Sequence, residues 1–288
     1  MEILDNTKCE LGEGPIYDPT SNTLFWFDII GKRMFSRSYS EAANTHEYAL
    51  PFMTSCMARI DAERQILATE KGLYFRDLKT SKLTHYLDLE ADNPKTRSND
   101  GRVHPSGSLW LGTMNKEAEK HAGSIYIIRK DTVKRFYANI TIPNGICFSP
   151  NGEFGYFTDT FVNILYRVAL DPKTGFPIDE PSVFYDYRNG IGGLDGAVTD
   201  KNGSLWIALW GEGRILCLSC KGKPIATFDI PAKQPSCPAF VQHTLDCLVV
   251  TSAWQGMSKR ERNAARKDGM LFTINPKVQG KEEPVMII

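Results

Sequence analysis

The feature that most constrains the fold is an internal repeat that runs along the chain. Three segments share an Asn-Asp, Asn-Gly or Asp-Gly pair, a short apolar run, a polar turn and a second apolar run: NDGRVHPSGSLWLGTM (99–114), IPNGICFSPNGEFGYFTDT (142–160) and GLDGAVTDKNGSLWIALW (193–210). Three weaker copies join them when all are aligned on the residue before the turn. Spacings of 43, 43, 45, 51 and 43 residues separate the six copies. A repeat of this length is typical of propellers and other repeat folds.

Each copy is expected to hold four short strands. In the third copy these are GRVHP, SLWLGTM, SIYIIRK and VKRFYAN, which are rich in β-forming residues and separated by turn residues. A helical solenoid would need apolar residues at helical spacing, and a β-sandwich would not explain six equivalent positions. We therefore predict an all-β, six-bladed β-propeller with four antiparallel strands per blade, a single domain over residues 1–288. Helix is expected mainly at 257–267, MSKRERNAARK.

Charge and cysteine content restrict which partners and which cellular compartment we expect. Lys+Arg and Asp+Glu number 34 each, so no net field favours a nucleic acid or an anionic membrane. The start of the chain has no apolar signal region, and no apolar run reaches the roughly 18 residues of a membrane span. Seven cysteines without a dense framework suit a reducing compartment. We expect a cytoplasmic monomer or weak homo-oligomer that binds a small molecule.

One aligned position carries oxygen-bearing side chains in four of the six copies. It lies five residues before each turn and is occupied by Glu13, Cys56, Asn99, Asn144, Asp195 and Pro238. Equivalent positions on the innermost strands of a propeller converge on the central channel, and a ring with two carboxylates is costly there unless a cation neutralises it. Oxygen donors suit Ca²⁺, Mg²⁺ or Mn²⁺. The alternative is that the glycine pairs only shape turns.

Taken together, these motifs resemble the SMP-30/gluconolactonase/LRE family of regucalcin-like sugar lactonases. The resemblance covers nearly the whole chain and rests on LGEGPIYD, RSNDGRVHPSGSLWLGTM, IPNGICFSPNG, LDGAVTDKNGSLWIA and TSAWQGM followed by GMLFTI, in this order. It implies a six-bladed propeller with one divalent metal ion near the axis. Calcium is the expected ion, with Zn²⁺, Mn²⁺ and Mg²⁺ as alternatives.

The resemblance also implies roles for individual residues. Glu13, Asn144 and Asp195 would be the metal ligands, with Asp195 also transferring protons. Substrate contacts would come from Arg97, Asn99 and Glu117, with Glu119 as an alternative to Glu117. Without the resemblance, Arg97 would be read as a surface residue of the polar loop NPKTRSND.

The implied activity is hydrolysis of a carboxylic ester, namely the opening of an aldono- or aldarolactone to the sugar acid. A metal ion can polarise the lactone carbonyl and lower the pKa of a bound water, while Asp195 serves as general base. Arg97 offers a forked donor to lactone oxygens or to a substrate carboxylate. The alternatives are a phosphotriesterase-like metal-dependent hydrolase and a non-catalytic calcium-binding or regulatory propeller. A serine triad is disfavoured because G-x-S-x-G is absent and the histidines are scattered.

Overall fold

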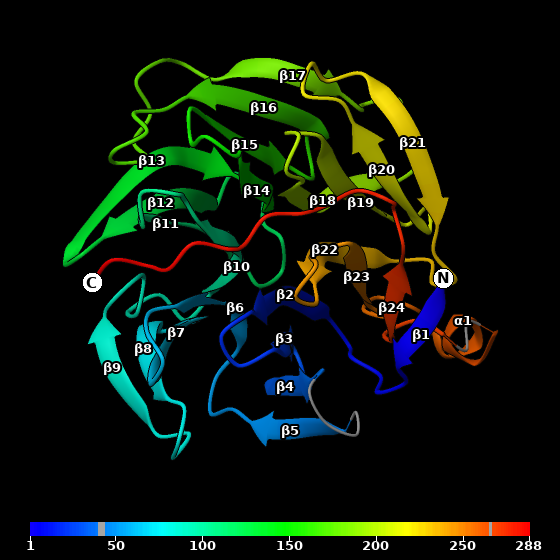
Figure 1. Ribbon diagram of the computed structural model, residues 1–288, viewed down its shortest axis with the longest axis horizontal. Helices are drawn as coiled ribbons and strands as arrows, with labels where there is room; N and C mark the ends of the chain where they lie inside the picture. The colour runs from blue at the N-terminus through cyan, green and yellow to red at the C-terminus, as the bar shows by residue number, and fades with distance from the viewer. Residues whose placement is uncertain (40–43, 265–266) are drawn as a thin grey trace.

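The protein is a six-bladed β-propeller, as the repeat predicts. In the computed structural model, which describes residues 1–39, 44–264 and 267–288, the described strands form six four-stranded sheets. Figure 1 shows the six sheets arranged radially around a central axis. Neighbouring strands within each sheet are antiparallel. Among the described residues, no helix is long and apolar enough to cross a membrane.

Five blades are each built from one continuous segment, with the first strand innermost. The first consists of β2 (Gly12–Asp18), β3 (Thr23–Asp28), β4 (Arg33–Ser38) and β5 (Thr45–Ala49). The second consists of β6 (Thr54–Arg59), β7 (Arg64–Thr69), β8 (Gly72–Asp77) and β9 (Leu83–Leu87). The third consists of β10 (Thr96–Val103), β11 (Leu109–Asn115), β12 (Gly123–Arg129) and β13 (Thr132–Ile140).

The fourth and fifth blades follow the same order. The fourth consists of β14 (Pro143–Phe148), β15 (Phe154–Asp159), β16 (Ile164–Ala169) and β17 (Ser182–Asp186). The fifth consists of β18 (Gly193–Thr199), β19 (Leu205–Trp210), β20 (Arg214–Leu218) and β21 (Pro224–Asp229). Innermost strands are buried along nearly their whole length, whereas the outermost strands are largely exposed.

The sixth blade differs from the expectation of four strands per repeat. The last repeat supplies three strands, which are β22 (Pro235–Val241), β23 (Cys247–Ser252) and β24 (Leu271–Ile274). The fourth strand is β1 (Glu2–Asp5), from the other end of the chain, paired antiparallel with β24. This pairing closes the ring of blades and covers the edge of β24. The helix α1 (Lys259–Ala264) lies between β23 and β24, within the segment predicted to be helical.

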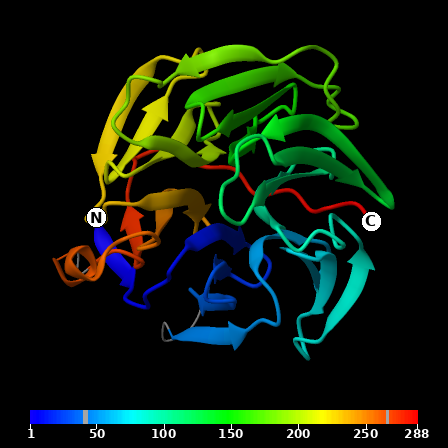
Figure 2. The same ribbon diagram turned by 180° about the vertical axis from the view of Figure 1, so that it is seen from behind.

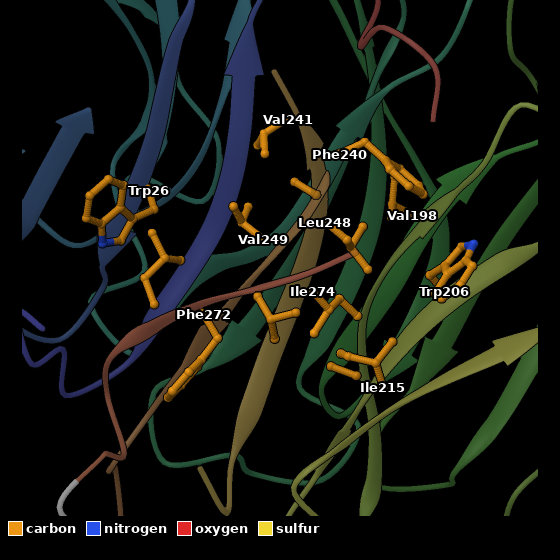
Figure 3. Close-up of a cluster of buried hydrophobic side chains, with 14 of the residues drawn as sticks. Trp26, Val198, Trp206, Ile215, Phe240, Val241, Leu248, Val249, Phe272 and Ile274 are labelled. Carbon is orange, nitrogen blue, oxygen red and sulfur yellow. The ribbon is translucent and has the colours of Figure 1, made fainter. Parts of the chain in front are cut away.

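Apolar side chains between adjacent blades form the core that holds the closed ring. Figure 3 shows Leu248 and Val249 of β23 lying between Trp26 of the first blade and Trp206 of the fifth. All four side chains are at most 2% exposed. The closing blade is thus packed on both faces, since each face meets a neighbouring sheet.

The Asn/Asp–Gly pairs lie in β-bulges and not in hairpin turns. Each innermost strand shifts its register against the next strand near the aligned position. A bulge bends the strand and re-aims its side chains. Gly14 and Gly145 adopt φ values of 55° and 64°, which favour glycine. At Gly196, an added Cβ would lie 2.5 Å from the Sγ of Cys237 on the next blade.

The C-terminal segment, residues 275–288, crosses the middle of the propeller in Figures 1 and 2. It lies at the end of the channel where the innermost strands finish, because the backbone N of Ile287 donates to the carbonyl of Gly107 at 2.9 Å. Within the channel, Glu283 pairs with Arg102, with 2.5 Å between Oε1 and the guanidinium. The tail therefore covers the end opposite the one where the innermost strands begin.

Candidate functional site

A cavity of about 210 Å³ lies at the end of the channel where the innermost strands begin. Small-molecule pockets commonly measure about 300–1,000 Å³, so this one suits a compact ligand such as one sugar ring. Its polar lining consists mainly of Glu13, Arg97, Asn99, Lys116, Asn144, Thr160 and Asp195. Apolar walls come from Leu11, Met114, Ile142 and Trp210, among others.

The structure thus brings together the four oxygen-bearing residues of the aligned position. Glu13, Asn99, Asn144 and Asp195 come from β2, β10, β14 and β18 and all line this cavity. The other two members of the register, Cys56 and Pro238, are not among the lining residues. Cys56 lines a smaller cavity deeper in the channel, beside Arg102 and Glu283.

Two carboxyl groups are buried in this cavity. Glu13 is 9% exposed and Asp195 is 5% exposed. Burial and then the charge of Asp100 raise the pKa of Glu13 to about 8. Burial and then the charge of Glu13 raise the pKa of Asp195 well above its ordinary value. Among the residues that the structure describes, no salt bridge involves either carboxylate.

A chain of hydrogen bonds fixes the amide side chains. The Nδ2 of Asn99 donates to the Oδ1 of Asn144 at 2.8 Å and to the carbonyl of Pro143 at 2.9 Å. The Nδ2 of Asn144 donates to the Oγ1 of Thr160 at 2.8 Å, and that hydroxyl donates to the carbonyl of Leu194 at 2.7 Å. These bonds connect the third, fourth and fifth blades and set which way each amide oxygen faces.

Arg97 lies inside the cavity, which corrects its reading as a surface loop residue. It belongs to β10 and is 5% exposed. Its guanidinium donates to the Oδ1 of Asn99 at 2.7 Å and to the carbonyl of Ser98 at 2.9 Å. Burial lowers the pKa of Arg97 to about 10, while Glu13 and Asp195 oppose that shift. The side chain therefore remains cationic at neutral pH.

The donor set fits a divalent cation. Burial raises the pKa of both carboxyl groups, and the charge of Glu13 raises that of Asp195 further. A nearby positive ion stabilises such an arrangement. With the amide oxygen of Asn144, the two carboxylates make an all-oxygen set of the kind that Ca²⁺ prefers. Within the described part of the chain, no group of three or more His, Cys, Asp or Glu side chains is placed to hold a metal. Such a site would thus depend on an amide ligand and on solvent.

Glu117 and Glu119 lie outside the cavity lining. The side chain of Glu117 is exposed, and Glu119, also exposed, accepts a hydrogen bond from Asn115 at 3.2 Å. Their roles in substrate binding stay predictions. The neighbouring Lys116 lines the cavity instead. Strand alternation could have indicated it, since Lys116 follows Met114 by two residues and so shares its face of the strand.

Comparisons with known proteins identify the family of the chain. The model of the SMP-30/Gluconolactonase/LRE-like region matches residues 11–254. A putative sugar lactone lactonase of Rhizobium meliloti (strain 1021) is 46% identical over 281 residues, 98% of this chain and 95% of that protein. A 6-deoxy-6-sulfogluconolactonase of Pseudomonas putida is 30% identical over 96% of this chain and 94% of that protein.

The solved structure of a calcium-binding protein, regucalcin, from Agrobacterium tumefaciens strain C58 has the same fold over this whole chain. It superposes with a TM-score of 0.98 and is 43% identical, covering 100% of this chain and 97% of that one.

Proposed function

The chain belongs to the SMP-30/gluconolactonase/LRE-like family, and from this premise we propose that it is a metal-dependent hydrolase that opens a sugar lactone to the sugar acid. One observation carries the proposal: two buried carboxylates, two amides and an arginine converge in a cavity of single-sugar size. Several relatives are named for lactone hydrolysis, including an L-arabinolactonase that is 30% identical. The free cysteines are in keeping with a reducing, cytoplasmic location.

Glu13, Asn144 and Asp195 would hold the divalent ion. Calcium is the ion we propose, because the donors are oxygens and the 43% identical structure is described as a calcium-binding protein. When bound, a divalent cation supplies Lewis-acid polarisation of the lactone carbonyl and stabilises the negative charge that develops on it. The buried carboxylates would both be ionised in its presence, since its charge lowers their pKa values.

Asp195 is the proposed general base. As a carboxylate, it accepts a proton from the attacking water while the water oxygen bonds to the carbonyl carbon. The bond from that carbon to the ring oxygen then breaks, and the proton passes from Asp195 to the leaving oxygen. The products are a carboxylic acid and a hydroxyl group on the opened chain. Burial at 5% exposure keeps the side chain away from bulk water.

Arg97 and Asn99 would position the substrate. Arg97 uses one terminal nitrogen for Ser98 and Asn99, which leaves its other N–H groups for lactone oxygens. Asn99 donates its two Nδ2 protons to Pro143 and Asn144. Its Oδ1 accepts one hydrogen bond from Arg97, so a second lone pair remains to accept a bond from a sugar hydroxyl. The two residues would therefore recognise different groups of the sugar.

A substrate panel tests the proposed function. Purified protein is assayed by pH-stat against aldonolactones, aldarolactones and a phosphotriester, each with Ca²⁺, Zn²⁺, Mn²⁺ or Mg²⁺ added. The expected result is proton release above the spontaneous rate with at least one lactone and little with the phosphotriester. Turnover of the phosphotriester alone would assign a different hydrolase activity. Calcium binding without any turnover would favour a non-catalytic regulator.

A further inference from the structure

Lys116 is a second cationic residue of the cavity, and strand pairing places it beside Arg97. Arg97 of β10 pairs directly with Met114 of β11. The ladder continues past the strand end, where the backbone N of Lys116 donates to the carbonyl of Lys95 at 2.8 Å. Lys116 and Arg97 are therefore diagonal neighbours on one face of the sheet, a relation in which the Cα atoms lie about 7–8 Å apart. Both line the cavity.

The two cations lie at different depths. β11 runs toward the end of the channel where the cavity opens. Lys116 therefore lies nearer the mouth than Met114, the residue that pairs with Arg97. Exposure agrees with this order: 27% of the Lys116 side chain is exposed, whereas Arg97 as a residue is 5% exposed. A ligand held at the carboxylates and Arg97 would thus extend its far end toward Lys116.

A salt-bridge network keeps Lys116 at the mouth and leaves that side positive. The Nζ of Lys116 lies 2.5 Å from Oε2 of Glu70, and the Nζ of Lys32 lies 3.8 Å from Oε1. The single carboxylate of Glu70 thus pairs with two ammonium groups, which leaves one positive charge in excess. Glu70 is itself fixed by a hydrogen bond from the backbone N of Met53 at 3.0 Å. Three blades contribute to this network through their loops.

The ammonium group of Lys116 has donors to spare. An ammonium carries three N–H groups, and Glu70 is the hydrogen-bond acceptor for its side chain within the described part of the chain. The remaining donors are free for a ligand. A carboxylate is the group that gains most from such contacts, because charge-assisted hydrogen bonds are about twice as strong as neutral ones.

We propose that Lys116 determines specificity by selecting lactones that carry an anionic group, a carboxylate above all, at the end of the carbon chain remote from the reacting carbonyl. This inference rests on the proposed function, because it assumes that the lactone carbonyl lies at Asp195. The substrate class is then the aldarolactones, whose second carboxylate reaches the mouth of the cavity. A sulfonate in that position shares the same chemistry.

Matched variants test this selection. Lys116→Met removes the charge and keeps the length, Lys116→Arg keeps the charge, and Lys120→Met removes an exposed charge from the same loop. Each is assayed at saturating divalent ion on an aldarolactone, its uncharged amide and a neutral aldonolactone. Lys116→Met should lose 10- to 100-fold in kcat/KM on the aldarolactone, mainly through KM, in line with a hydrogen bond to a charged group. The uncharged substrates should be unaffected.

The remaining variants act as controls. Lys116→Arg should retain the preference for the charged lactone, and Lys120→Met should behave as wild type. A sulfonate-bearing lactone is run beside the aldarolactone to tell the two anions apart. An equal loss on charged and uncharged substrates would show a merely structural role for Lys116 and overturn the inference, as would an unchanged Lys116→Met.

Calorimetric binding of the ring-opened acids separates this inference from the proposed function. Wild type should bind the dicarboxylate more tightly than the monocarboxylate, and Lys116→Met should abolish that difference. If no lactone is hydrolysed but the difference is seen and lost in this way, the selection stands and the proposed hydrolysis falls. If neither hydrolysis nor a binding difference is found, both are overturned.

Discussion

Asp195 and Asn144 occupy equivalent positions in two blades, yet they differ in what chemistry they can perform. Both side chains line the cavity and carry an oxygen atom. Asp195 can also exchange a proton, whereas the amide of Asn144 cannot. Arg97 lies two residues before the equivalent position of the third blade and carries a positive charge, so it cannot coordinate a cation. The proposed roles in metal binding, proton transfer and substrate binding can therefore be tested separately by substitution.

Replacing Asp195 and Arg97 should therefore have distinct effects. Asp195→Asn should keep some metal affinity but lose kcat on the order of 10²- to 10⁴-fold, the usual cost of losing an acid–base group. Arg97→Ala should leave metal affinity intact and lower kcat/KM. Lactone hydrolysis at saturating metal, with calorimetry of metal binding, makes the comparison. A near-normal kcat in Asp195→Asn would place the base elsewhere.

His104 gives a pH-dependent contribution to stability. It lies at the turn that follows β10 and is 0% exposed. Its Nδ1 accepts from the backbone N of Ser106 at 3.0 Å, and its Nε2 lies 2.8 Å from the carbonyl of Gly152. This network favours the neutral ring with the proton on Nε2. Burial lowers the pKa of His104 below its ordinary value of 6.5.

The direction of this pH dependence follows from the difference between the pKa of His104 in the folded and in the unfolded chain. As pH falls below about 6.5, the unfolded chain takes up a proton before the folded one, so the stability due to His104 is lost as pH approaches its folded pKa. His104→Gln should cost about 1–3 kcal/mol at pH 7, and the gap to wild type should narrow by pH 5. Urea unfolding at several pH values measures it. His243→Gln, at an exposed residue, is the control and should change the free energy of unfolding at pH 7 by no more than about 0.5 kcal/mol.

At the scale of elements, the C-terminal segment is tied into the channel by a buried ion pair. Arg102 of β10 donates to the carbonyls of Ile146 and Ala197 at 3.1 and 3.0 Å, and its third partner is Glu283. The two paired side chains are 7% and 9% exposed. Removing one partner of such a pair leaves a charge in a poorly solvated place.

Neutralising that partner should destabilise the fold. Glu283→Gln is expected to lower the free energy of unfolding by about 3–5 kcal/mol, the cost of breaking a buried ion pair. Glu282→Gln, an exposed neighbour on the same segment, should change it by no more than about 0.5 kcal/mol. Denaturant unfolding of the two variants decides the matter, and equal stabilities would contradict the role assigned to Glu283.

Elements formed by neighbouring residues could be predicted from the sequence, whereas those formed by distant segments could not. The repeat predicts the innermost strands and the register of Glu13, Asn144 and Asp195, because the strand pairs within a blade are close in sequence. The pairing of β1 with β24 joins opposite ends of the chain and leaves no periodic signal. Strand alternation places Lys116 on the same face as Met114, but its place at the mouth of the cavity also depends on its ion pair with Glu70 of another blade, which leaves no signal in the local sequence.

At the scale of the whole molecule, the closed ring gives the channel two different ends. One end carries the cavity with its buried carboxylates, and the other is crossed by residues 275–288. We propose that residues 1–288 act as a single domain, because the sixth blade takes strands from both termini. Closure also holds four blades at fixed distances around Glu13, Asn99, Asn144 and Asp195, which a cation site requires.

We propose that a divalent ion held by Glu13, Asn144 and Asp195 supports lactone hydrolysis. The most direct test is the initial rate of lactone hydrolysis by chelator-stripped protein as Ca²⁺ is titrated back. We predict a rate near the spontaneous background without the ion, and a saturable rise as the ion is added. A full rate in the presence of chelator, with no metal found by elemental analysis, would contradict the claim.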